Sequence, residues 1–471
     1  MRARASRWVL AVAASVAASC AVQQPPPAED LRREALPNTS VPAVFKAGGS
    51  AAEVTGNWLA TFGDPALPAL VDEALAYNAD LKVAAARVAQ AAGYVKVAGA
   101  ALLPAVGVTA HGGGKLGGDG SGLQGVWLSG SLELDVWGRV RYGRAAALAQ
   151  SAAAEADYAY ARQSLAALVT KAWFVAIEAG LQRGIAQVTL GSSQELLRVS
   201  EDRLRVGSGS DQAVAEARAN IGPYRDTLRQ VELSREQALR ALELLLGRYP
   251  AAEIAVADRP ASVPADVPVG LPSQLLERRP DVIAAERRVA AAFDRVGEAK
   301  AAQLPRISLT AGGSNISSDL FVLKDHSNPV WSFGANLLAP IYQGGALRAQ
   351  VEIRSAEQAQ AVAEYARAGQ RAFGEVEGAL SAELALRDRA VILETSVRDN
   401  ERALDLTRIQ FRVGTVDQRA VEQRNMALYA ARTSRLRVQS ELLAQRVNLF
   451  LALGGGFGEP QAVPVAMKQA Q

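Results

Sequence analysis

The sequence predicts a mainly α-helical protein that is built from a duplicated unit and carries a transmembrane β part. Three observations predict this class. The chain matches itself at an offset of about 201 to 207 residues. Two long tracts contain no proline, and each copy contains segments in which apolar and polar residues alternate. The copies are 66–247 and 273–453, and each is predicted to form a helix, a β-hairpin and two long helices.

Composition limits the possible functions. The chain has 471 residues, is 49% hydrophobic and only 6% aromatic, which is typical of long helices that pack through small side chains. A net charge of +3 without a dense basic block argues against a nucleic-acid partner. One cysteine and two histidines exclude an intrachain disulfide and disfavour a zinc centre. No nucleophile elbow, phosphate loop or metal-ligand cluster is present, so we predict neither catalysis nor a cofactor.

The N-terminus resembles a bacterial lipoprotein signal. A positive start and an apolar run at 8–18 precede small residues and the sole cysteine, Cys20. We predict a signal peptide at 1–19, with a covalent lipid on Cys20; the alternative is an ordinary secretory peptide cleaved nearby. Ala21 follows the cysteine, so the aspartate that marks inner-membrane retention is missing. The proline-rich segment 20–49 is predicted to be a lipidated tether.

The first helix of each copy leads into a predicted β-hairpin, at 104–138 and at 305–342. Period-two alternation over about ten residues is typical of barrel strands. No later run of eighteen apolar residues exists, so a membrane crossing would require a closed barrel. Four strands cannot close a conducting barrel, so several copies would have to contribute. Glu133 and Asp135 could set selectivity if they face the lumen; the alternative is a hydrated wall without that role.

The long helices come next. The spans 139–205 and 344–412 would each reach about 100 Å if unbroken, and the return helices are 211–247 and 417–453. Residues repeat every seven positions along the long arms, a coiled-coil interval: Leu190, Leu197, Leu204 and Val397, Leu404, Phe411. The remaining segments are rich in proline and glycine and are predicted to form an equatorial belt: 50–65, 248–272 and 454–471.

Several motifs resemble those of TolC-like outer-membrane efflux factors, in particular their lipoprotein branch, the NodT-type component of tripartite RND efflux systems. The segments that carry the resemblance are Trp58, 61–67, 78–81, 270–281, 339–345 and the turn 412–414. The resemblance covers nearly all of the mature chain, and its most distinctive stretch is Gly-Leu-Pro-Ser-Gln-Leu-Leu-Glu-Arg-Arg-Pro-Asp at 270–281.

The resemblance implies a lipid-anchored homotrimer in the outer membrane that extends into the periplasm. Each copy would give four strands to a shared twelve-stranded barrel, and the helices would form a coiled-coil tunnel. Its tip would meet a periplasmic adaptor, or membrane fusion protein, and an inner-membrane RND-type pump. The chain would then be a passive exit duct for small molecules such as drugs. Two alternatives stay open: a duct for protein secretion, and a pore-less periplasmic adaptor or structural lipoprotein.

The resemblance also places the tunnel tip at two helix–helix turns, which contain Arg205 and Gly207 in the first copy and Arg412 and Gly414 in the second. Glycine suits these turns because it accepts left-handed geometry.

Some family members carry acidic residues six and nine positions after the second turn glycine, where this chain has Ala420 and Gln423. Asp417, Arg419 and Glu422 lie nearby instead. We therefore expect a charge-paired constriction rather than an acidic ring. The alternative for Asp417 is that it simply caps the return helix.

Overall fold

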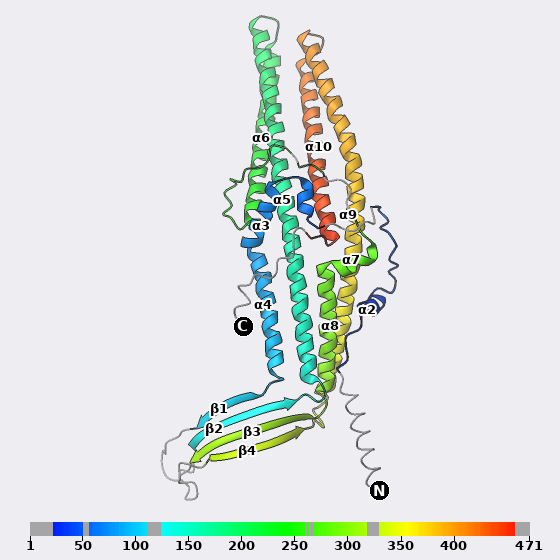
Figure 1. The fold of residues 1–471 in the computed structure, drawn as a ribbon. Coiled ribbons are helices and arrows are strands. Elements are labelled where there is room, and N and C mark those ends of the chain that lie inside the picture. The colour runs from blue at the N-terminus through cyan, green and yellow to red at the C-terminus, as the bar shows by residue number, and fades with distance from the viewer. Residues whose placement is uncertain are drawn as a thin grey trace. The chain divides into compact units, whose positions relative to one another are not determined.

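The computed structural model describes residues 22–49, 56–111, 124–259, 261–263, 268–317 and 329–456. Cys20 and the predicted signal peptide lie outside these residues, as do parts of the predicted belt. The elements follow one another in this order (Figure 1): α2 (Ala28–Ala35), η1 (Trp58–Phe62), α3 (Ala66–Tyr77), α4 (Ala79–Ala100), β1 (Ala105–His111), β2 (Gln124–Leu134), α5 (Arg139–Arg205), α6 (Asp211–Leu245), α7 (Pro272–Arg278), α8 (Pro280–Ala301), β3 (Arg306–Ser317), β4 (Pro329–Leu338), α9 (Ala346–Arg412) and α10 (Gln418–Ala452).

The duplication is visible in the helix lengths. Helices α4 and α8 have 22 residues each, α5 and α9 have 67 each, and α6 and α10 have 35 each. The observed bounds of α5, α6, α9 and α10 lie within two residues of the predicted ones. The single helix predicted at the start of each copy is instead two helices, α3 and α4 in the first copy and α7 and α8 in the second. Helix α9 begins two residues later than expected because Gly344 and Gly345 have φ values of 59° and 83°, which a right-handed helix does not accommodate.

The chain folds as two compact units. The first comprises Met1–Thr39, Ala86–Asp157 and Asp281–Gly369, and the second comprises Ser40–Ala85, Tyr158–Pro280 and Gln370–Gln471. The first unit holds the sheet, in which the strands are antiparallel and ordered β1-β2-β3-β4. The central pair, β2 and β3, joins the two sequence copies side by side (Figure 1).

The predicted tether is more structured than expected. In the first unit it contains α2, and Leu31 is buried. The backbone N–H of Gln23 donates to Tyr142 Oη at 2.8 Å. In the second unit, the N–H groups of Lys46 and Ala47 both donate to the Glu377 carboxylate at 2.8 Å. A proline-rich segment with a few apolar residues can therefore pack along helices, which composition alone does not reveal.

An aromatic cluster forms the core of the second unit. Trp58 and Phe62 of η1 pack between α5 and α10: the Trp58 ring stacks on Phe450 at 5.5 Å between centroids, and Phe62 lies 5.1 Å from Phe174. Asp64 accepts from the Ala66 N–H at the start of α3 and from Trp173 Nε1 at 2.7 Å. The motif at 58–67 therefore packs this part of the chain against the long helices.

The most distinctive motif also has a structural role in the second unit. Arg279, between α7 and α8, is only 1% exposed. Its Nη1 donates to Glu375 of α9 at 2.6 Å and to the carbonyl of Ala452 in the last turn of α10 at 3.1 Å. A hydrogen bond to the last helical carbonyls satisfies an acceptor that the helix leaves open. The arginine thus joins three helices.

Helix α5 bears on the prediction that no helix after the N-terminal segment can span a membrane. Among the described residues it is the helix that is long and apolar enough to cross a membrane, with a window of mean hydropathy 1.4. That window is 56% buried in the protein, and α5 supplies core residues such as Ala166, Trp173 and Ile177. Buried core helices share this property, so the window is weak evidence for a span.

Candidate functional site

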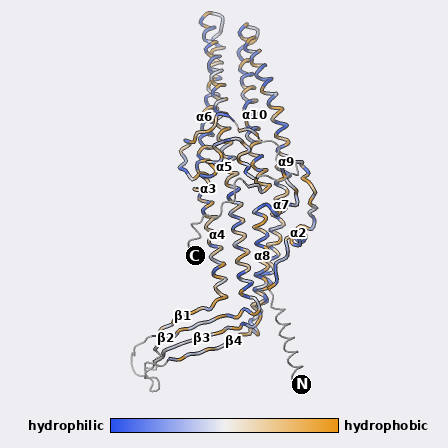
Figure 2. Tube along the Cα trace, in the orientation of Figure 1, coloured by the Kyte–Doolittle hydropathy of each residue, from blue (hydrophilic) through white to orange (hydrophobic). Residues whose placement is uncertain are grey.

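The four-stranded sheet has one apolar and one polar face. Side chains alternate along a strand, and directly paired residues share a face. Hydrophobic and hydrophilic residues accordingly occur along every strand (Figure 2). The register gathers the following residues on the apolar face: Val106, Val108, Ala110, Val126, Leu128, Leu132, Leu134, Ile307, Leu309, Ala311, Trp331, Phe333, Ala335 and Leu337.

The opposite face is largely polar. It carries Thr109, Ser129, Ser131, Glu133, Arg306, Ser308, Thr310, Ser314, Ser332 and Asn336, with Ala105, Trp127, Val330 and Leu338 as apolar exceptions. On the apolar face, the large side chains Trp331 and Phe333 are 72% and 85% exposed in the single chain. An exposed apolar face opposite a polar one is the arrangement of a barrel wall between lipid and water.

Within the described residues the sheet is open at both edges. Strands β1 and β4 pair on one side only, so each presents a row of unpaired backbone N–H and C=O groups. Lipid offers these groups no hydrogen-bond partners. The sheet can therefore occupy a membrane only if other strands cover its edges.

Glu133 and Asp135 lie where β2 passes into α5. Arg139 donates from Nε and Nη2 to the two carboxylate oxygens of Glu133, at 3.0 and 2.7 Å. Asp135 accepts from the N–H groups of Val140 and Arg141, each at 2.9 Å, and so caps the start of α5. Both carboxylates are thus engaged in fixing the strand–helix junction, and their role in selectivity stays a prediction.

The helix–helix turns of the two copies have the same geometry. Gly207 and Gly414 have φ values of 76° and 81°. After each glycine, the next N–H reaches back to the carbonyl five residues earlier: Ser208 to Arg203 at 2.9 Å and Thr415 to Gln410 at 3.0 Å. This is the glycine-terminated helix end known as a Schellman motif. The left-handed geometry predicted for both glycines is confirmed.

The arginines of the turns are less alike. Arg205 forms an ion pair with Asp202 at 3.0 Å, whereas Arg412 is exposed and no carboxylate of the described residues lies within ion-pair distance. Between arginine and glycine, Val206 and Val413 are 75% and 69% exposed. Each turn therefore presents an apolar side chain to its surroundings.

The three gate candidates have separate roles in the single chain. Asp417 caps α10 by accepting from the Ala420 N–H at 3.0 Å. Arg419 donates from Nε to Glu216 of α6 at 3.0 Å. Hydrogen bonding to Arg419 lowers the pKa of Glu216 to about 2. The ion pair links the two return helices.

Glu422 is buried, 6% exposed. It accepts from Ser193 of α5 at 3.4 Å, and burial together with the Glu422 carboxylate raises the pKa of Tyr224 on α6. The structure therefore does not bring Asp417, Arg419 and Glu422 to one constriction within the chain. A gate role for them stays a prediction.

One contact at the tip was not predicted from the sequence. The guanidinium of Arg203 on α5 lies 4.1 Å from the ring centroid of Phe411 on α9, and its Nη2 donates to the Phe411 carbonyl at 2.8 Å. Phe411 belongs to the buried cluster that includes Leu196, Leu404 and Val421. The sequence did contain a signal for this contact: Phe411 takes the place in the second heptad series that Leu204 has in the first. A cation can bind to the face of an aromatic ring but not to a leucine side chain.

A duplicated set of long helices joined to an open sheet with one apolar face defines a membrane channel whose wall is completed by assembly. The chain belongs to the outer membrane efflux protein family, whose sequence model matches residues 70–248 and 271–455.

Known members are similar over most of their length. The pyoverdine export outer membrane protein OpmQ of Pseudomonas aeruginosa is 32% identical over 430 residues, which cover 87% of this chain and 90% of that protein. The cation efflux system protein CusC of Escherichia coli K12 is 32% identical over 418 residues, covering 85% and 88%. The solved outer-membrane channel OprN is 28% identical with a TM-score of 0.80, covering 89% of this chain and 98% of that one.

These similarities confirm the predicted fold class and the prediction of an outer-membrane efflux duct. The pore-less adaptor alternative loses its support, because the matched proteins are channels and efflux proteins of the outer membrane.

Proposed function

We propose that the chain forms a homotrimeric outer-membrane exit duct of a tripartite efflux system, anchored by a lipid on Cys20. Three copies would contribute twelve strands to one barrel. The observation that carries this proposal is the sheet: its apolar face fits lipid, its polar face fits a water-filled lumen, and both of its edges need strands from other copies. Transport through such a duct requires no catalytic step and no cofactor.

The proposed partners are a periplasmic adaptor and an inner-membrane RND-type pump. The adaptor would contact the turns around Gly207 and Gly414, where Val206 and Val413 are exposed. The proposed cargo is small molecules. Relatives are named for pyoverdine export, cation efflux and toluene efflux, which supports this cargo class over secreted protein.

The test of the duct is single-channel conductance of the purified full-length protein in planar bilayers, together with its mass in detergent. We expect discrete conductance steps and a mass of about three chains of 49.5 kDa. A monomer that does not conduct would refute the proposal.

The cargo is tested in a strain that lacks the gene. We expect increased susceptibility to toxic small molecules, restored by the intact gene. Unchanged susceptibility together with loss of a secreted protein would favour a secretion duct instead.

The lipid is tested by the mass of the mature chain. We expect a lipid increment that is lost in Cys20→Ser, and an unmodified mature N-terminus would refute lipidation.

A further inference from the structure

A cleft opens between the two helical hairpins of the second unit and reaches the end of α9. Its volume is about 650 Å³, within the ~300–1,000 Å³ typical of small-molecule sites. One wall comes from α5 and the other from α9 and α10. The lining residues are Val188, Gly191, Ser192, Glu195, Leu196, Val199, Arg408, Phe411, Arg412, Val421 and Asn425.

The cleft is apolar along its length and basic at one side. Leu196, Phe411 and Val421 are buried parts of one apolar cluster, and Val188 is 59% exposed. The acidic residue of the lining, Glu195, is already paired with Arg198 at 2.6 Å. The lining therefore combines apolar surface with the positive charges of Arg408 and Arg412.

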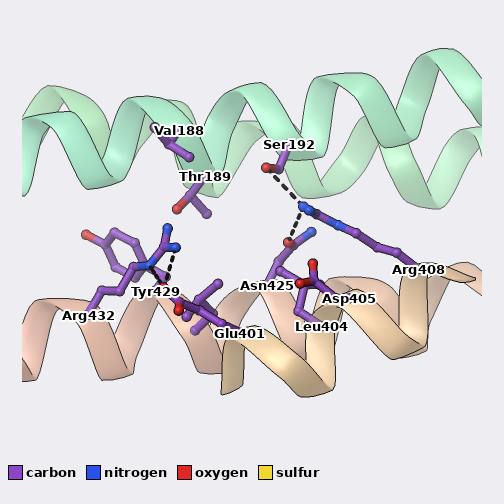
Figure 3. A pocket seen from close by; sticks show the side chains of 11 residues that line it. Val188, Thr189, Ser192, Glu401, Leu404, Asp405, Arg408, Asn425, Tyr429 and Arg432 are labelled. Atoms are coloured by element: carbon purple, nitrogen blue, oxygen red, sulfur yellow. Dashed lines mark hydrogen bonds and ion pairs between the residues drawn. The ribbon is translucent and has the colours of Figure 1, made fainter. Parts of the chain in front are cut away.

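Arg408 is half-buried and has only neutral partners. Its Nη2 donates to Ser192 Oγ of α5 at 3.2 Å and to Asn425 Oδ1 of α10 at 3.3 Å, as Figure 3 shows. Among the described residues no carboxylate lies within ion-pair distance of this guanidinium. A partly buried charge without an opposite charge is costly, and an incoming anion would relieve that cost.

The neighbouring cavity does not offer the same complementarity. It measures about 360 Å³ and shares Val188, Ser192, Arg408 and Asn425 with the cleft. Its other charged residues include Glu401, which is paired with Arg432 at 2.7 Å, and Asp405 (Figure 3). The carboxylates on this side disfavour an anion, so the apolar cleft is the favoured place for the hydrocarbon part of a ligand.

We infer that this cleft binds small amphiphilic anions, with a carboxylate or sulfonate on Arg408 and an alkyl or aryl chain against Leu196, Phe411 and Val421. An occupant would touch α5 of one hairpin and α9 and α10 of the other. All the lining residues belong to one chain, so binding can be tested independently of the proposed function.

Calorimetry on the full chain in lipid nanodiscs, with empty nanodiscs subtracted, tests the inference. The probe is octane-1-sulfonate, and the matched cation is octyltrimethylammonium. We expect saturable binding of the sulfonate, with one site per chain, and at least tenfold weaker binding of the cation. Equal affinities, or no saturable sulfonate binding, would overturn the inference.

Three variants separate charge from shape. Arg408→Met should weaken sulfonate binding at least tenfold, because it keeps the length of the side chain and removes the charge. Gly191→Phe should abolish binding by filling the cleft; a Cβ at Gly191 would meet no atom within 4 Å, so the helix tolerates it. Arg402→Met removes an exposed charge of α9 that does not line the cleft and should bind as the wild type does.

Gly191→Phe also guards against misfolding of the Arg408 variant, because it leaves every charge in place. Wild-type affinity in Gly191→Phe, or in a folded Arg408→Met, would overturn the inference. A loss of equal size in Arg402→Met would do so too, because it would reduce the effect to general surface charge.

Discussion

Single residues decide how each long helix reverses direction. Gly207 and Gly414 occupy left-handed backbone conformations at equivalent places in the two copies, and the cap residues Ser210 and Asp417 start the return helices in equivalent ways. Outside glycine, the left-handed conformation costs roughly 1–2 kcal/mol. The duplication has therefore preserved the backbone requirement of the turn, although the polar side chains around it differ.

Gly414→Val should destabilise the protein by about 1–2 kcal/mol, because valine is strained at a φ of 81°. The measurement is the thermal unfolding midpoint of the purified protein. Gly378→Ala is the matched control: it lies inside α9, and a Cβ at either glycine meets nothing within 4 Å. Alanine in a helix is favoured over glycine by roughly 1 kcal/mol, so the control should be neutral or stabilising. Equal losses in both variants would contradict the turn geometry.

Asp294 of α8 is a second residue with a measurable consequence. It is 3% exposed, and its Oδ1 has no hydrogen-bond partner among the described residues. Burial raises the pKa of Asp294 to about 6. The folded state therefore binds the proton more tightly than the unfolded state does. The resulting stability is fully present below the ordinary aspartate pKa and is lost as the pH rises through about 6.

Asp294→Asn should remove this part of the pH dependence, because the amide stays neutral at every pH. We expect the variant to unfold at a higher temperature than the wild type at pH 8. The difference in the free energy of unfolding should be on the order of 2 kcal/mol at pH 8 and should shrink toward pH 4. Thermal unfolding of both proteins across this pH range is the measurement. A constant difference between them at all pH values would show that the carboxyl does not titrate as described.

Among the secondary-structure elements, the helices and the strand faces could be predicted from the sequence, but the strand pairing could not. The long helices α5, α9 and α10 follow from the absence of proline, whereas α6 continues through Pro223. The helix ends follow from glycine and capping residues, which are local signals. The strand faces follow from period-two alternation. The sequence could not show that β2 and β3 would pair across the two copies, because pairing is not local. Nor could it show that Glu133 and Asp135 would be engaged at a junction, since their partners Arg139 and Arg141 looked like ordinary helix residues.

The apolar face of the sheet gives a prediction with neighbouring residues as test and control. Phe333→Lys places a charge on the apolar face, which should cost about 2–4 kcal/mol near the middle of a bilayer. Ser332→Lys places the same charge one residue away on the polar face and should be tolerated. The measurement is the amount of assembled protein in isolated outer membranes. Similar loss for both variants would contradict the assignment of the two faces.

At the scale of the whole molecule, the described chain is incomplete as a channel. Its sheet has two open edges, its apolar face is exposed, and the described strands number four. The central claim is that sister chains supply what is missing, with β1 of one copy paired to β4 of the next. Only that pairing would close the barrel and give the duct a continuous wall.

Cysteine pairs across the proposed seam test this claim most directly. One cysteine replaces Val106, Val108 or Ala110 in β1 and a second replaces Trp331, Phe333 or Ala335 in β4, so that every pair lies on the same face. Facing residues in adjacent antiparallel strands are close enough for a disulfide at non-hydrogen-bonded positions. We predict that at least one register yields covalent dimers and trimers of the membrane-inserted protein on non-reducing gels. Monomer alone at every register, from protein that is inserted and folded, would contradict the account.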